Sequence, residues 1–468
     1  MFCQYGAGGA TTPSPYWQNI RALANDHAVE APPAFDSPTR AWRPRELAVA
    51  ALRGFGGAHV GPRPLSATVQ SILLPLTDPI GQMEVARVLS AAAWRNRPSL
   101  DPARIASLLG NKIGASASYL ECRARCPYQH FVRYFLRPNE IESSEFQSTD
   151  AGNFAHATLS RFTALMRDRG LDTAPLDEAA LDSLFAEAVG PPRKRLVATG
   201  MAAHPSGKVL LDRLEKILRG MAVWIREAIR LMQYQPVREE AKFGGRAADS
   251  LAGLALGEFA PGWSLELRGQ IDRIDIGASD GSRQAIAVDY KLRQRKFDFS
   301  LWEAGENLQL PVYMLVIAAN PELDAAPAGG LYAEILPAKD ADGLEKPRKF
   351  LGVYRDGAVQ GDLANVQTVL QHANGAPEKD PPPKWGSAIT DREFNALLLR
   401  SRQTIAEIAS AVVSGDIAVA PSRRGNATAC TYCQYGPVCG IDYTLNRART
   451  KPMRSRPDIL MSLREVEE

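Results

Sequence analysis

Two aspartates and a lysine in the middle of the chain have the types and the spacing that phosphodiester hydrolysis requires. Asp272 lies in WSLELRGQIDRIDIG (263–277), and Asp289 and Lys291 lie in QAIAVDYKL (284–292). Both segments show strand-like patterns, and the intervening turn SDGS predicts a hairpin that brings the two carboxylates to one end of a sheet. Residues two apart on a strand face the same side, so Asp289 and Lys291 are expected to project together.

Paired carboxylates suit a hard divalent cation such as Mg²⁺, or Mn²⁺ in its place, which keeps water molecules among its ligands. An ammonium group beside that cation would orient or help activate one of those waters. The pattern D-x(n)-D-x-K is short and its residues are common. By spacing alone, exposed strand ends therefore explain it better than a metal site does.

A second candidate site is a cysteine cluster in ACTYCQYGPVCG (429–440), where Cys430, Cys433 and Cys439 follow a C-x2-C-x5-C pattern. Thiolates bind zinc and iron–sulfur clusters alike, and either site usually takes four ligands. In a reducing compartment, cysteines at such short spacing are more often metal ligands than disulfides. One ligand must therefore come from another part of the chain.

The elements that would position these residues change type near Pro236. Amphipathic helical patterns dominate residues 1–110 and 115–235, whereas strand patterns follow. A helix is expected over 307–320, with Pro311 housed in its first turn. The remaining expected elements are strands at 263–277, 284–292, 329–337 and 349–357, a Pro-rich link at 376–385 and a helix at 392–415. A small mixed sheet flanked by helices, and hence an α/β fold, is predicted.

Composition is that of an ordinary globular chain. The 468 residues are 45% hydrophobic and carry a net charge of +3, which by itself is too small to indicate nucleic-acid binding. The basic runs PPRKRL (191–196) and KLRQRK (291–296) would either meet phosphates or form solvated faces. The start of the chain lacks a secretory signal pattern, and no stretch approaches the roughly 18 apolar residues of a membrane span. We therefore expect a cytoplasmic protein without membrane contacts.

Four segments place these residues in a known context, because they occur in the order seen in the RecB-type nuclease domain of the PD-(D/E)XK superfamily. The chain resembles that domain over roughly residues 115–445, and most resembles the nuclease end of AddB-like subunits. The resemblance implies a restriction-endonuclease-like core. The segments are PVREEAKFG (236–244), LRGQIDRID (267–275), VDYKL (288–292) and LQLPVYML (308–315).

The resemblance assigns the metal-binding residues. Glu240 falls on the acidic residue of the first strand, Asp272 and Asp289 on the two metal-binding aspartates, and Lys291 on the motif lysine. His156, in AGNFAH, matches a G-x-x-x-H helix that supplies a further metal ligand.

The resemblance also implies that the backbone carbonyl of Tyr290 is a metal ligand. Gln309 and Tyr313 form a Q-x3-Y motif on one helix face, implying DNA contact and support of the site. Taken singly, each match has an ordinary alternative: a structural histidine, a surface Gln–Tyr pair, or a solvated Glu239 or Glu240. The presence of all these motif matches in the right order favours the nuclease.

The resemblance points to Cys126, in the C-P-[FY] context of ECRARCPYQHF, as the missing thiolate. Cys126, Cys430, Cys433 and Cys439 would then hold a [4Fe–4S] cluster, with a structural Zn²⁺ as the alternative. A cofactor bound by these four residues would close a long loop. The resulting loss of chain entropy in the unfolded state corresponds to about 5–6 kcal/mol of stability. Cys122, one helical turn before Cys126, is interpreted as a packed thiol, and Cys3 as incidental.

The function implied is that of a Mg²⁺-dependent DNA exonuclease acting on single-stranded ends in double-strand-break repair and recombination. Alternatives are a catalytically idle DNA-binding or scaffold subunit and a small CRISPR-associated nuclease. The single Gly-Lys pair, in AAHPSGKVLL, lacks the spacing and the following Ser or Thr of a Walker A motif. Unwinding is therefore expected to need an AddA-like helicase partner.

The expected organisation has three parts. Residues 1–110 resemble the tail of a helicase-like region, 115–445 form the nuclease domain, and 446–468 form a C-terminal tail. Because AddB-like subunits are more than twice this length, the chain is expected to be a split subunit, a truncated product or a free-standing nuclease.

Overall fold

A computed structural model describes most of the chain beyond residue 98. The described residues are 99–138, 146–171, 177–200, 205–232, 234–245, 247, 249–279, 281–293, 295–337, 348, 350–358, 387–441 and 448–465. They belong to one compact unit, Arg97–Glu468. The helices predicted before residue 99, Cys3 and the Pro-rich link at 376–385 lie outside the described residues.

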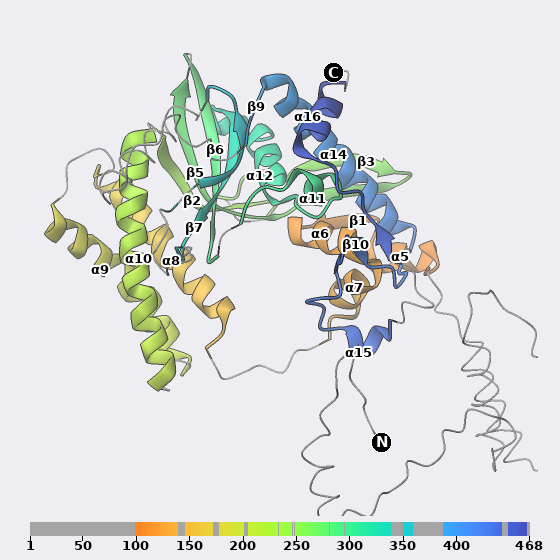
Figure 1. Ribbon diagram of the computed structural model, residues 1–468, viewed down its shortest axis with the longest axis horizontal. Coiled ribbons are helices and arrows are strands. Elements are labelled where there is room, and N and C mark those ends of the chain that lie inside the picture. The colour runs from red at the N-terminus through yellow and green to blue at the C-terminus, as the bar shows by residue number, and fades with distance from the viewer. Residues whose placement is uncertain are drawn as a thin grey trace, which may run out of the picture. The chain divides into compact units, whose positions relative to one another are not determined.

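The centre of this unit is a mixed sheet with strand order β2-β5-β6-β7-β8-β9 (Figure 1). Neighbouring strands are antiparallel except for β6 with β7 and β8 with β9, which are parallel. This arrangement confirms the predicted α/β fold with a small mixed sheet. The strands are β2 (Gln235–Phe243), β5 (Gly269–Ser279), β6 (Ser282–Lys291), β7 (Ala326–Glu334), β8 (Phe350–Arg355) and β9 (Ser387–Ile389).

The single strand predicted at 263–277 is wrong, because the chain breaks it into β4 (Trp263–Leu267) and β5. β4 lies in a separate sheet, between β1 (Lys112–Ala115) and β3 (Ala255–Ala260). The break falls at Arg268, and β5 begins at Gly269, where an added Cβ would lie 2.7 Å from the ring of Phe243. The apolar alternation continues through both strands because both contribute to one core, which hides the break in the sequence.

Helices cover both faces of the main sheet. α8 (Ser148–Asp168), α9 (Glu178–Ala198) and α10 (Pro205–Met232) bury one face, and α12 (Gln309–Ala318) leads the helices on the other. The α12 bounds confirm the predicted helix with Pro311 in its first turn. The other helices on that face are α6 (Ala117–Arg125), α14 (Asp391–Val413) and α16 (Arg456–Arg464).

The smaller elements are α5 (Pro102–Leu109), α7 (Pro127–Phe131), a π-helix (Val132–Leu136), α11 (Phe299–Glu303), a 3₁₀ turn (Pro321–Leu323), β10 (Ser422–Arg424), β11 (Ala427–Thr428), α15 (Gly436–Cys439) and β12 (Arg449–Thr450).

The C-terminal segment contributes to the same core. Ile459 and Leu463 of α16 are buried with the residues of α14 and α12, so the predicted tail at 446–468 is packed where it is described. Within the described part of the chain, no helix combines the length and apolarity needed to cross a bilayer.

Candidate active site

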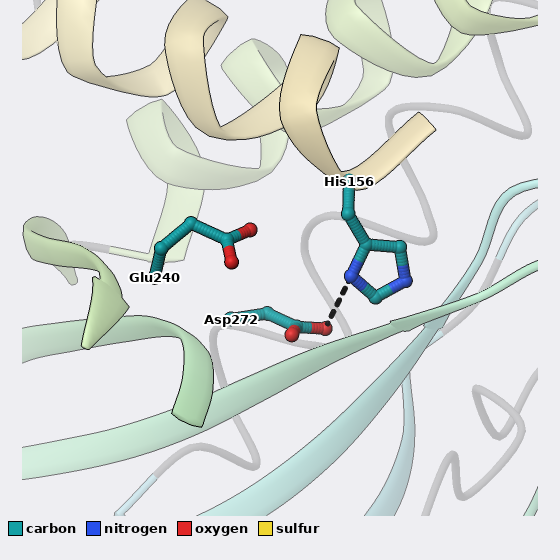
Figure 2. Close-up of side chains that lie close together, drawn as sticks. All are labelled: His156, Glu240 and Asp272. Atoms are coloured by element: carbon teal, nitrogen blue, oxygen red, sulfur yellow. Dashed lines mark ion pairs between the residues drawn. The ribbon is translucent and has the colours of Figure 1, made fainter. Parts of the chain in front are cut away.

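Three side chains from three elements meet at one end of the sheet. His156 comes from α8, Glu240 from β2 and Asp272 from β5, and their ligand atoms all lie within 4.8 Å of one another (Figure 2). His156 Nδ1 is 3.2 Å from Asp272 Oδ2. These residues, which lie far apart in the sequence, were all predicted to share one site.

Asp272 and Asp289 lie at this end of the sheet because β5 separates from β6 there. Their ladder ends at the pair Arg273 and Val288, so the next pair, Asp272 and Asp289, lies where the strands part. Beyond that point the backbone N–H of Tyr290 donates to Asp272 Oδ2 at 2.8 Å. The N–H and C=O of one strand residue point to the same side, so the Tyr290 carbonyl also faces β5. That orientation suits the predicted role of the carbonyl as a metal ligand.

Asp289 is buried and is held by donors from two elements. Gln309 Nε2 donates to Asp289 Oδ1 at 2.6 Å, and the hydroxyl of Tyr313 donates to the same oxygen at 3.3 Å. Lys291 forms an ion pair with the other carboxylate oxygen, as expected from two residues on one strand face. The Q-x3-Y pair therefore contacts the aspartate directly, and Gln309 remains the more accessible of the two.

The structure distinguishes the two neighbouring glutamates of β2. Glu239 is buried in an ion pair with Arg167 of α8, whereas Glu240 faces His156 and accepts a hydrogen bond from Gln270. The backbone of Glu240 has φ 49°, in the left-handed region that side chains other than glycine rarely adopt. The alternative of a solvated glutamate therefore applies to neither.

The carboxylates raise one another's affinity for protons. Burial, followed by the charge of Asp272, raises the pKa of Glu240 to about 7 and that of Asp289 to about 6. Burial alone would lower the pKa of His156, but its hydrogen bond to Asp272 and the nearby carboxylate charges outweigh burial and raise it. One oxygen of Glu240 is buried without a hydrogen-bond partner. This donor set fits a divalent cation, which would relieve the repulsion.

A buried ion pair that the sequence patterns did not reveal lies behind the site. The guanidinium of Arg273 donates to both oxygens of Asp275 at 2.7 Å and to the hydroxyl of Tyr290 at 2.7 Å. All three side chains are buried. The spacing of Arg273 and Asp275 was the one sequence feature that could have indicated this ion pair, since residues two apart on a strand share a face. The contact ties β5 to β6 one residue from each aspartate.

Glu121 of α6 is a second residue that was not predicted from the sequence. Its Oε1 accepts the backbone N–H groups of Leu308 and Gln309 at 2.9 and 3.2 Å, so it binds the start of α12. The carboxylate is 5% exposed. Gln309 in turn donates to Asp289, which makes Glu121 a positioning residue for the site. No sequence pattern marks a lone glutamate in this role.

Replacing Glu121 by alanine is expected to lower the free energy of unfolding by about 1–3 kcal/mol, because two buried N–H groups lose their acceptor. Hydrogen exchange at Leu308 and Gln309 should accelerate, and Glu121→Gln should recover much of the loss. Glu178→Ala, which removes an exposed ion pair on α9, is the control and should change stability by less than about 0.5 kcal/mol. Unchanged exchange at Gln309 would contradict the positioning role.

The four predicted cysteine ligands line one hollow. Cys126 meets Cys430, Cys433 and Cys439 there, among apolar and aromatic neighbours, whereas Cys122 does not line it. The helix predicted through Cys126 ends at that residue, since a proline follows it. Burial raises the pKa of Cys122 to about 11, as for a packed neutral thiol.

Other contacts also join the two ends of this unit. The guanidinium of Arg449 donates to the carbonyls of Ala124 and Arg125 at 2.7 and 3.1 Å, next to Cys126. Arg123 forms an ion pair with Asp416 at 2.6 Å. The cysteine site therefore lies where the chain is already closed, and a cofactor there would reinforce an existing contact.

The metal-free protein is expected to become more stable as pH falls from about 8 to about 5. Because the folded pKa of Glu240 lies above its ordinary value, the folded state binds the proton more tightly, and this stabilisation is lost as pH rises through about 7. Added Mg²⁺ should raise the melting temperature most above pH 7. Thermal melts of the parent and Glu240→Gln isolate the effect, and identical pH profiles would contradict it.

The known proteins that are similar to this chain agree with the fold described above. The family model of the PD-(D/E)XK nuclease superfamily matches residues 115–440. Curated relatives that carry the name of one subunit of an ATP-dependent helicase/deoxyribonuclease, AddB, include the protein from Desulforudis audaxviator, 30% identical over 79% of this chain and 33% of its own length. Those from Moorella thermoacetica and Lacticaseibacillus casei are 28% and 27% identical over 93% and 92% of this chain. The chain spans 33–39% of the length of these relatives.

Proposed function

The chain belongs to the PD-(D/E)XK nuclease superfamily, and from this premise we propose that it is a divalent-metal-dependent DNA exonuclease that degrades single-stranded ends in double-strand-break repair and recombination. The observation that carries the proposal is the meeting of His156, Glu240 and Asp272 beside the paired Asp289 and Lys291. No one of these residues alone indicates hydrolysis, but together they provide metal ligands and a cation at one point.

The reaction requires water to attack phosphorus while the bond to the leaving oxygen breaks. His156, Asp272, Asp289 and the Tyr290 carbonyl would hold the Mg²⁺ or Mn²⁺, which supplies charge neutralisation at the phosphate when bound. Lys291 orients the attacking water, and Glu240 assists with water or a second ion. Gln309 and Tyr313 keep Asp289 directed into the site. The attacking water gives up a proton to solvent as its oxygen bonds to phosphorus, and the leaving oxygen takes up a proton from solvent.

Several observations support this function over the alternatives. The acidic residues and Lys291 are all present, with Glu240 and Asp272 close together and Lys291 paired with Asp289, which a disused site in a scaffold subunit would not require. The named relatives align over most of the chain, including the part before residue 115, which favours an AddB-like subunit over a small CRISPR-associated nuclease. Because their name is that of one subunit of a helicase/deoxyribonuclease and this sequence carries no Walker A motif, we propose an AddA-like helicase partner and a cytoplasmic location. The part from 115 to 445 is proposed as the nuclease domain, preceded by the tail of a helicase-like region.

The cysteine hollow is proposed to hold a [4Fe–4S] cluster. Four cysteines line it among mainly apolar and aromatic side chains, and four thiolates suit an iron–sulfur cluster or a zinc ion. The family resemblance favours the cluster.

Purified protein is expected to degrade labelled single-stranded DNA with Mg²⁺ or Mn²⁺ and to stop when a chelator is added. Asp289→Ala and Lys291→Ala should each lower the rate by about 10²–10⁴-fold, because the first removes a metal ligand and the second the cation beside the attacking water. Arg169→Ala, which breaks an exposed ion pair between the end of α8 and Glu187 of α9, is the control and should cleave like the parent. Full activity in Lys291→Ala would remove the assigned site.

Changing Cys126 to serine should abolish the broad visible absorption of an iron–sulfur cluster and lower the melting temperature. Cys122→Ser should keep the colour, because Cys122 does not line the hollow. Lys291→Ala should also stay coloured while losing cleavage, which separates the two sites. A colourless protein with one zinc by elemental analysis, or a brown Cys126→Ser variant, would show that the cofactor or the ligand is wrong.

A further inference from the structure

A hollow of about 640 Å³ adjoins the carboxylate site between α8 and α9. His156, Glu240 and Gln270 line it, as do Arg161 and Arg195. The face of α8 exposed there carries small side chains, such as Ala157 and Ser160, so a ligand can approach the helix closely. Two cations therefore line a space that continues from the metal ligands.

These two arginines differ from their neighbours in having no acidic partner among the residues that the structure describes. On α8 Arg167 pairs with Glu239, and on α9 Arg193 pairs with Asp212 and Glu215. In contrast, Arg161 and Arg195 form no ion pair with any carboxylate in the described part of the chain. The Nε of Arg161 is buried and has no hydrogen-bond acceptor there.

We propose that this hollow is a phosphate subsite, in which Arg161 and Arg195 bind the backbone phosphates next to the scissile phosphate on a single DNA strand. The inference rests on the proposed nuclease function. A metal ion at the carboxylates neutralises one phosphate, whereas the adjacent phosphates would meet the negative charge of Glu240 and Asp272. Arginine forks match phosphate oxygens and offset that repulsion. The basic run at 191–196 thus contains one residue that contacts substrate and one, Arg193, that is already paired.

A second basic hollow, lined by Lys112, Lys242 and Arg268, is a weaker candidate. Glu266 lies 3.1 Å from Lys112 and 2.9 Å from Arg268, so two of its three cations are already neutralised. Phosphate binding there would have to break those ion pairs. The cations of the first hollow are available without such a loss.

The test is the salt dependence of binding of a fluorescent 15-nucleotide oligothymidine, with Ca²⁺ replacing Mg²⁺ and the oligonucleotide checked for integrity on a gel. Each lost phosphate contact on a single strand should reduce the slope of log K against log salt by about 0.7. Arg161→Ala and Arg195→Ala are each expected to show that reduction, and the double variant about twice as much. Arg161→Lys should keep the parent slope, because it keeps the charge.

Arg193→Ala is the matched control, since it lies two residues from Arg195 on α9 and is already paired. It should bind with the parent slope. Parent slopes in both Arg161→Ala and Arg195→Ala, or an equal reduction in Arg193→Ala, would overturn the subsite. A parent protein that binds the oligonucleotide with the expected slopes but does not cleave it with Mg²⁺ would instead refute the nuclease function while leaving the subsite in place.

Discussion

Repulsion among three closely placed carboxylates is the constraint that the rest of this structure balances. Glu240, Asp272 and Asp289 meet where two strands separate, and their mutual charge favours protonation of the first and the last. Each also has a hydrogen-bond or ion-pair partner from outside the trio. These partners are Gln270 for Glu240, the Tyr290 amide and His156 for Asp272, and Gln309, Tyr313 and Lys291 for Asp289.

The cysteine hollow and the carboxylate site share a mechanical connection through α6. Glu121 on that helix binds the first amides of α12, and α12 carries Gln309, which binds Asp289. The same helix ends at Cys126. One helix therefore contacts both the cysteine hollow and the element that carries Gln309.

The sequence was most informative where local pattern and site coincide. Alternation on one strand was enough to place Asp289 and Lys291 side by side, and the Asp-Gly turn was enough to pair the two strands. His156 and Glu240 came only from the family resemblance, because nothing in their own segments links residues so distant in the chain. The periodicity of the sequence alone predicts only a structural histidine and a solvated glutamate at these two positions.

Other features could not be predicted because they depend on tertiary neighbours. The break between β4 and β5 was hidden, since Leu267 and Ile271 enter one core and keep the same alternation on either side. Glu121 has no motif, as its partners are backbone amides far along the chain. Whether an arginine has a carboxylate partner within the described part of the chain, as Arg193 has and Arg195 does not, depends on which helix packs beside it.

The left-handed backbone at Glu240 has a consequence for how this protein can change over evolutionary time. A residue other than glycine costs about 1–2 kcal/mol in that conformation. Glycine would adopt the same φ without that cost, so folding stability alone favours losing the carboxylate. A laboratory search that rewards heat resistance alone would therefore favour glycine at this position, at the expense of the carboxylate.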